Sequence, residues 1–545
     1  MDRRVALRHE PLIRRADGRV AAGACALAAI GVLVLGAFAG MAVEAARDPS
    51  GAASAFNPYL WRVARFTLVQ AALSTVLSVV PAIFVARAFA ASPDLPVRRF
   101  ALSLFALPLA LPAIVAALGV LALYGRAGLV AGPLGALTGG TWPGIYGLSG
   151  ILVAHVFFNL PLATRLILGA LETVPADQWR LAAQLGMGGR ARFRLIEWPV
   201  LKAAVPGVAA LVFMLCITSF TIVLTLGGGP RATTLEVAIY QALRFDFVPS
   251  RAVALVAVQI ALTVAAVLVL SRLGGEPVPD RNLPVATRRP PGTRWSRAAD
   301  AAIVGIAFVF VAGPLAAVLV SGLAADLGRL AADPAVHRAT ATSLAFAALS
   351  ASIAVALSLA LAAGRSALAQ RRHGRARLLA PLMDTGAGFV LVVPPIVVGA
   401  GWFILLRGTT DVLALAPVMV VTVNAVMAMP FALRAIRPAW DLSAARHDRL
   451  AASLGMAGAA RWRLVEWPAL RRPLLVAFAF AMALSLGDLG VIALFGSDAV
   501  QTLPYLLLQR MGSYRTADAA GIALMLGALC LLLMWIADRG GERAG

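Results

Sequence analysis

Two stretches of this chain are near copies of each other. Residues 180–199 read RLAAQLGMGGRARFRLIEWP, and residues 449–468 read RLAASLGMAGAARWRLVEWP. Fifteen of the twenty positions are identical, at a constant offset of 269 residues. Because this offset is about half of the 545-residue chain, the repeat predicts two related halves.

The similarity extends upstream of these two stretches. The same offset pairs Pro161 with Pro430, and the pattern Pro-x-Ile-Val-x-x-x-Gly occurs at 112–119 and again at 394–401. The repeat therefore includes apolar segments as well as polar ones.

The composition indicates an integral membrane protein. Hydrophobic residues make up 60% of the chain and charged residues 14%, whereas soluble domains are about 45–50% apolar and about 25% charged. Since a transmembrane helix needs about 20 apolar residues, there is material for roughly a dozen spans. We expect an all-α fold with twelve transmembrane helices, at about 20–43, 65–90, 99–124, 149–172, 201–225, 251–272, 299–323, 339–364, 379–406, 415–436, 471–495 and 517–537.

The basic residues predict the orientation of the chain. It has 48 basic and 26 acidic residues, a net charge of +22. The arginines lie in short runs between apolar stretches, the positive-inside pattern of membrane proteins, and this pattern places both termini in the cytoplasm. The same distribution argues against nucleic-acid binding, since such domains gather basic residues on one face.

A stretch rich in proline, glycine and arginine, residues 273–298, divides the chain into a first half (1–272) and a second half (299–545). Proline interrupts helices, so we expect a cytoplasmic linker here. Six spans in each half make the halves parallel, and a translocation path would then lie between them.

Both copies of the repeat lie in predicted cytoplasmic segments, here called the first docking loop (173–200) and the second docking loop (437–470). Each begins with a short helix that has small and apolar residues on one face and ends at a glycine, which tolerates the left-handed backbone of a helix end. Such a helix suits docking into a partner's groove. The alternative is a basic loop that only contacts lipid headgroups. The duplication favours a partner.

The residues expected to dock are Arg180, Leu181, Ala182, Ala183, Gly186, Glu197 and Pro199 in the first docking loop, and Arg449, Leu450, Ala451, Ala452, Gly455, Glu466 and Pro468 in the second.

The sequence shows no site for catalysis or for a metal. The single lysine, Lys202, does not lie in the Gly-Lys-Ser/Thr context of a phosphate-binding loop, so any ATP would be hydrolysed by another chain. Three isolated cysteines and five histidines form no cluster with metal-ligand spacing.

The two docking loops resemble the cytoplasmic motif of binding-protein-dependent ABC importer permeases, Glu-Ala-Ala-x(3)-Gly-x(9)-Ile-x-Leu-Pro. Nine residues separate Gly186 from Ile196, and nine separate Gly455 from Val465. In that family the loop docks on the ATP-binding subunit.

This chain departs from the family motif at two positions in each copy. Arg180 and Arg449 stand in place of the glutamate, and Trp198 and Trp467 in place of the leucine. The missing glutamate puts the usual contact to the ATP-binding subunit in doubt, but not the docking itself.

Residues 218–247 and 485–515 resemble, within that family, the permeases of thiamine and thiamine-pyrophosphate importers, which also join two six-span halves in one chain. The resemblance implies a type I importer permease in the bacterial inner membrane. It further implies two copies of an ATP-binding subunit, which hold ATP and magnesium, and a periplasmic binding protein and membrane lipid as the other partners. It implies no cofactor in this chain. The alternatives are a permease for another small solute such as ferric iron, and an ion-coupled secondary transporter.

Polar residues within spans are candidates for a substrate path, because charges inside a membrane are costly. Asp488 lies in the outer half of the predicted eleventh span, and Ser219 is its equivalent in the first half. A carboxylate here would favour the cationic thiazolium ring that the resemblance implies. His155 and Asn159, in the predicted fourth span, are candidates for the same path or for packing between helices.

Overall fold

The computed structural model describes residues 10–92, 98–272, 294–369, 380–383, 386, 388, 390, 393–408, 411–456 and 458–542. The regular structure in these residues is helical throughout. Among the described residues, ten helices are long and apolar enough to cross a membrane, and a pair of helices bent by 115° (Arg98–Ala110 with Ala113–Tyr124) forms an eleventh candidate span. The apolar helix Pro395–Leu406 is shorter than a span. Each of these segments overlaps one of the twelve predicted ranges, and the predicted all-α membrane fold is confirmed. Residues 273–293 of the predicted linker lie outside the described residues.

In the first half of the sequence the helices are α1 (Glu10–Arg47), α2 (Pro49–Ser54), α3 (Pro58–Ala91), α4 (Arg98–Leu104), α5 (Leu107–Ala110), α6 (Ala113–Tyr124), α7 (Ala131–Thr138), α8 (Leu148–Glu172), α9 (Ala176–Gln184), α10 (Gly189–Arg192), the π-helix η1 (Phe193–Glu197), α11 (Trp198–Ile217), α12 (Thr221–Leu226), the 3-10 helix η2 (Pro230–Ala232), α13 (Leu235–Arg244) and α14 (Pro249–Arg272). In the second half they are α15 (Arg294–Leu323), α16 (Leu327–Ala332), α17 (Pro334–Ala369), α19 (Pro395–Leu406), α20 (Ala416–Ser453), α21 (Gly458–Arg461), the π-helix η4 (Trp462–Glu466), α22 (Trp467–Leu486), α23 (Gly490–Phe495), α24 (Leu503–Gly512) and α25 (Thr516–Glu542).

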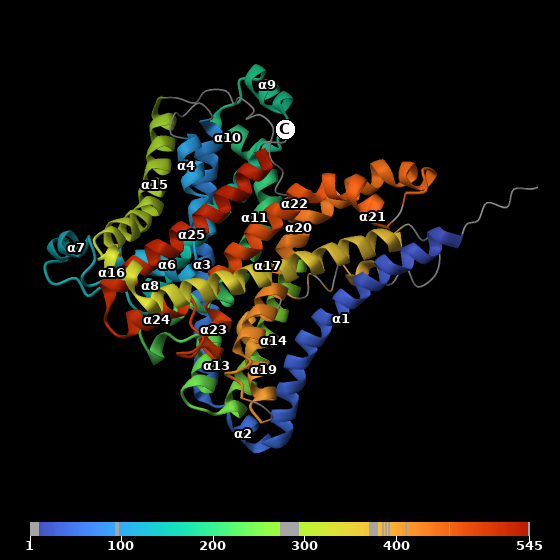
Figure 1. The fold of residues 1–545 in the computed structure, drawn as a ribbon. Coiled ribbons are helices and arrows are strands. Elements are labelled where there is room, and N and C mark those ends of the chain that lie inside the picture. The colour runs from blue at the N-terminus through green and yellow to red at the C-terminus, as the bar shows by residue number, and fades with distance from the viewer. Residues whose placement is uncertain are drawn as a thin grey trace, which may run out of the picture. The chain divides into compact units, whose positions relative to one another are not determined.

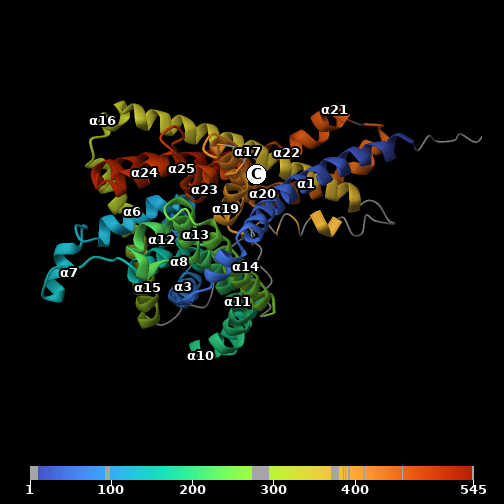
Figure 2. The ribbon, with the colours of Figure 1, turned by 90° about the horizontal axis from the view of Figure 1, so that it is seen from below.

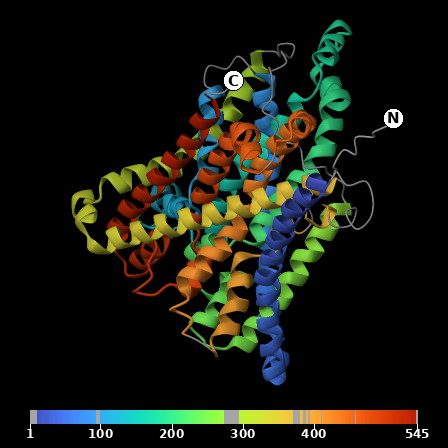
Figure 3. The ribbon, with the colours of Figure 1, turned by 45° about the vertical axis from the view of Figure 1, so that its right-hand side comes forward.

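The helices form two compact units that do not follow the order of the chain. Unit 1 contains Met1–Asp48, Pro334–Tyr505 and Leu529–Gly545, and unit 2 contains Pro49–Asp333 and Leu506–Ala528. In unit 1, α17 packs against α20 and α22, and α1 packs against α17 and α19 (Figures 1 and 3). In unit 2, α3 packs against α8 and α11, and α15 packs against α6 and α3 (Figure 2). The first helix of each sequence half therefore packs on helices of the other half.

A repeated glycine in each unit receives this exchanged helix. Gly119 of α6 lies so close to α15 that a Cβ there would be 2.6 Å from the carbonyl oxygen of Pro314. Gly401 of α19 lies so close to α1 that a Cβ there would be 2.2 Å from the carbonyl oxygen of Ala37. These are the glycines of the repeated Pro-x-Ile-Val-x-x-x-Gly pattern, so the pattern marks two places where helix backbones lie in close contact.

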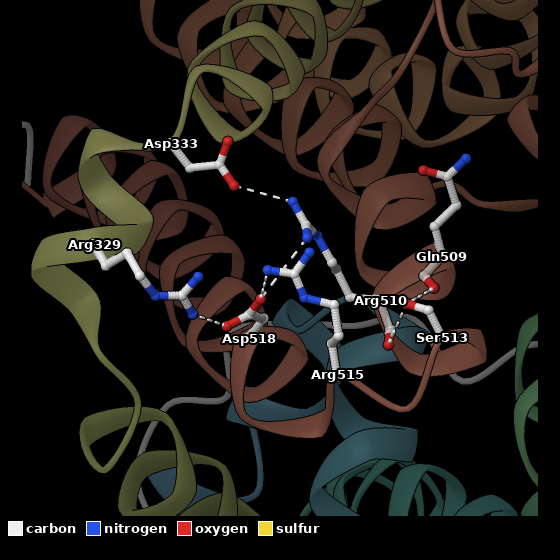
Figure 4. Close-up of polar contacts among 7 residues, drawn as sticks. All are labelled: Arg329, Asp333, Gln509, Arg510, Ser513, Arg515 and Asp518. Atoms are coloured by element: carbon white, nitrogen blue, oxygen red, sulfur yellow. Dashed lines mark hydrogen bonds and ion pairs between the residues drawn. The ribbon is translucent and has the colours of Figure 1, made fainter.

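An ionic cluster in unit 2 fixes the turn between α24 and α25 against α16 (Figure 4). The nearly buried carboxylate of Asp518 forms an ion pair with Arg515 at 2.6 Å and another with Arg329. Arg510 donates to Asp333 at 3.0 Å, at the residue that precedes α17. Five charged residues of opposite sign thus hold one end of these helices together.

The glycine contacts generate a stability prediction. Gly401→Ala should lower the stability of the protein by about 1–3 kcal/mol, because the added methyl group would overlap the backbone of α1. Gly31→Ala is the matched control, since nothing lies within 4 Å of a Cβ at that position of α1. The measurement is the thermal midpoint of the detergent-purified protein, read by size-exclusion chromatography after heating. Equal midpoints for the two variants would contradict the packing described here.

Candidate docking site and substrate path

The predicted helix end at the repeated glycine is confirmed in both docking loops. Gly186 has φ +61° and Gly455 has φ +65°, both in the left-handed region. The amide of the next residue then turns back to the helix: Met187 N donates to Ala182 O at 2.9 Å, and Met456 N donates to Ala451 O at 2.8 Å. This pattern satisfies carbonyl groups that the ending helix leaves open.

The helix before the glycine differs between the two docking loops. In the first, α9 is a separate helix whose N-cap is Pro175. In the second, the same segment is the end of α20, which runs unbroken from Ala416 to Ser453. Ala444 stands at the position equivalent to Pro175, so the feature that separates α8 from α9 is absent. The expectation that each loop begins with a short helix of its own is therefore wrong for the second loop.

The outward face of the docking helix carries leucines. In the first loop Leu181 and Leu185 are 56% and 63% exposed, and in the second the equivalent Leu450 and Leu454 are 58% and 66% exposed. The small residue Ala182 is buried with Trp179, Ile196 and Val174, and Ala451 is also buried. The expected small-residue face is thus only partly exposed, because the packing of Ala182 against Trp179 turns this alanine inward, while Ala183 stays exposed.

The remaining predicted docking residues fall into three groups. Arg180, Ala183, Gly186 and Pro199, with Arg449, Gly455 and Pro468, are exposed. The side chain of Ala452 lies outside the described residues. Arg180 forms an ion pair with Asp177 at 3.2 Å, but this pair is weak because both side chains are more than two-thirds exposed. The exposed surface of each loop is therefore apolar and basic.

Glu197 and Glu466 form the third group, because their side chains turn inward. Each ends a π-helix, η1 or η4, and each is only 8% exposed. Arg87 of α3 donates to Glu197 at 2.6 Å, while Glu466 is held by Arg19 of α1. The sequence did not predict the π-helices, which carry no residue signature in the repeat.

The predicted path residues of the first half lie inside the helix packing of unit 2. His155 Nδ1 lies 2.9 Å from Ser74 Oγ, which joins α8 to α3. Asn159 Nδ2 donates to Cys216 Sγ at 3.3 Å, which joins α8 to α11, and Gln70 donates to the carbonyl of the same cysteine at 2.9 Å. These contacts support the packing alternative for both residues. The spacing of Gln70 and Ser74 on one face of α3 was the signal for this polar layer.

Asp488 belongs to unit 1 and lies in a break between α22 and α23, not within a continuous eleventh span as the sequence suggested. Its two carboxylate oxygens accept from the amides of Gly490 and Val491, each at 3.3 Å, and so cap α23. Beside it, Asn424 donates to Ser485 at 3.1 Å. Ser219 lies in the equivalent break between α11 and α12. The two predicted residues therefore occupy matching interruptions of their helices.

Among the described residues, no group of three or more histidine, cysteine, aspartate or glutamate side chains is arranged to hold a metal ion.

Known proteins resemble this chain over nearly its whole length. The family of binding-protein-dependent transport system inner membrane components matches residues 78–274. The thiamine transport system permease protein of Brucella abortus (strain 2308) is 58% identical over 95% of this chain and 94% of that protein. The permeases of the same description from Salmonella typhimurium and Escherichia coli are 43% and 42% identical, each over 98% of both chains. The chain therefore belongs to the family of binding-protein-dependent inner-membrane transport permeases, together with these thiamine transport system permease proteins.

Proposed function

We propose that this chain is the membrane subunit of an ATP-driven importer and forms the path for thiamine or thiamine phosphates that a periplasmic binding protein delivers. Two copies of a separate ATP-binding subunit hold ATP and magnesium, and this chain carries out no chemistry and needs no cofactor of its own. Both termini and both docking loops face the cytoplasm. The high identity to thiamine transport system permease proteins supports the substrate class.

One observation carries the proposal: the two docking loops present the same surface. The exposed leucines at 181 and 185 recur at 450 and 454, and an exposed arginine precedes each first leucine. An exposed apolar patch repeated at two sites indicates a partner that binds twice in the same way. Two identical ATP-binding subunits meet that requirement, whereas a secondary transporter has no use for it.

Reconstitution tests this function directly. The purified chain should take up thiamine into proteoliposomes only when the ATP-binding subunit, ATP and the binding protein are all present. Uptake by the chain alone, driven by an ion gradient, would overturn the proposal in favour of a secondary transporter. Replacing thiamine by ferric iron in the same assay distinguishes the two substrates.

The exposed leucines should determine binding of the ATP-binding subunit. The double variant Leu185→Asp with Leu454→Asp should weaken assembly at least about tenfold, because it places a charge in an apolar contact at both sites. Leu137→Asp is the control, since this leucine of α7 is 83% exposed and lies outside the docking loops. Co-purification with the tagged ATP-binding subunit measures the effect. Equal yields from both variants would remove these leucines from the interface.

Asp488 should affect the cationic substrate. Asp488→Asn keeps an oxygen that can accept from Gly490 or Val491 but removes the negative charge. We therefore expect the KM for thiamine uptake to rise about threefold to tenfold, since one charge at partly solvated sites contributes a modest attraction. Asp498→Asn, at an exposed position, is the control. Unchanged uptake kinetics in the Asp488 variant would assign this residue to helix capping alone.

A further inference from the structure

The glutamate of each Glu-Trp-Pro sequence joins a docking loop to a transmembrane helix. In the first docking loop, Glu197 lies at the end of η1 and is nearly buried. Arg87 of α3 donates to it at 2.6 Å, and the guanidinium of the same arginine lies 4.5 Å from the ring centre of Phe193. Two residues of the loop thus hold one residue of α3.

In the second docking loop, Glu466 occupies the equivalent place at the end of η4. It forms ion pairs with Arg19 of α1 and with Arg461, whose Nε lies 3.0 Å away. Arg461 in turn pairs with Asp448 of α20, and the Arg19 guanidinium lies 5.6 Å from the ring centre of Trp440. The helix held by this loop is α1, which comes from the other sequence half.

The second docking loop pairs with α1, and not with the counterpart of α3 in the second half, for a structural reason. Thr67 of α3 accepts from the amide of Leu235, and Ser343 of α17 accepts from the amide of the equivalent Leu503. These matching contacts align α3 with α17 at an offset of 276 residues, and at this offset Ala363 stands in place of Arg87.

The residue after Ala363 is Gly364, and it explains how α1 comes to pair with the second docking loop. A Cβ built on Gly23 of α1 would lie 3.0 Å from the Cα of Gly364, so α1 crosses α17 in close contact at this level. One turn earlier in α1, Arg19 supplies the guanidinium that is absent at Ala363 of α17. In both loops the glutamate carboxylate is thus paired with an arginine, but the arginine comes from a different helix in each loop.

Each pair joins a nearly buried carboxylate to a partly exposed arginine. Separating such a pair costs free energy, because the carboxylate loses a charged partner, although Glu466 would keep Arg461. Each loop is therefore held firmly to its helix, while its outward leucines and arginine remain free for a partner. When a partner moves the loop, the helix at the other end of the ion pair must follow.

We propose that Glu197 and Glu466 are positioning residues that transmit movement of the docking loops to the membrane, the first loop to α3 and the second to α1. This inference rests on the proposed function, in which an ATP-binding subunit moves the loops. Both loops then bind the same kind of partner, but each loop moves a different helix.

The test is the number of thiamine molecules imported per ATP hydrolysed, measured in proteoliposomes with the complete importer. Glu197→Gln and Arg19→Ala should each lower this ratio about fivefold or more, a typical size for coupling between sites, while ATP hydrolysis and assembly with the ATP-binding subunit stay near the wild-type level. Arg329→Ala is the control, because it breaks an ion pair with Asp518 that involves neither docking loop.

Two further variants keep the test decisive if single variants assemble poorly. The exchange Arg87→Glu with Glu197→Arg restores opposite charges and should restore most of the ratio, and Arg19→Lys should do the same for the second loop. A purely structural role would lower assembly and hydrolysis together with transport. If ATP-driven uptake stands and the ratio is unchanged in Glu197→Gln and Arg19→Ala, the inference fails alone. If uptake needs no ATP-binding subunit, the proposed function fails.

Discussion

Close contact between helix backbones at two repeated glycines is the constraint on which the rest of the fold depends. In lipid there is no hydrophobic force between helices, so association relies on van der Waals contact and interhelical hydrogen bonds, and small residues allow both. Because Gly401 has no side chain, α1 can pack closely against α19, and Gly119 allows the same close packing of α15 against α6. Each exchanged helix then packs on a second helix, α17 or α3, and completes its compact unit. The exchanged helices α1 and α15 therefore bring their polar residues into contact with helices of the other sequence half.

Interruptions of the helices follow from a second constraint, since an unpaired backbone amide within a membrane is costly. The chain breaks near Ser219 and near Asp488, and it is interrupted again before α13 and before α24. At the second interruption of each half a hydroxyl accepts the first amide of the helix: Thr67 for α13 and Ser343 for α24. Asp488 accepts the first amides of α23. Asp488 therefore has a structural role, and any contact with a solute is added to it.

The sequence predicted what depends on local pattern and missed what depends on tertiary contact. Apolar length located the twelve segments, and glycine chemistry located the helix ends at Gly186 and Gly455. Hydropathy does not say which helix packs on which, so the exchange of α1 and α15 was not foreseen. Nor could the pattern orient a nine-residue helix: the buried Trp179 decides that Ala182 faces inward and Leu181 outward. The inward turn of Glu197 depends in addition on a π-helix that no residue type announces.

The same dependence on tertiary contact explains why two nearly identical stretches have different surroundings. Most exposed positions are identical in the two copies, including the leucines at 185 and 454, although Ser453 and Ala459 stand in place of Gln184 and Arg190. Positions that face inward are matched only in chemistry: both glutamates are paired with arginine, yet one arginine comes from α3 and the other from α1. In the proposed importer the same kind of partner surface meets both loops, which accounts for their similar outer faces. Their inner contacts are free to change, because any helix that brings a guanidinium to the buried carboxylate satisfies the same electrostatic need.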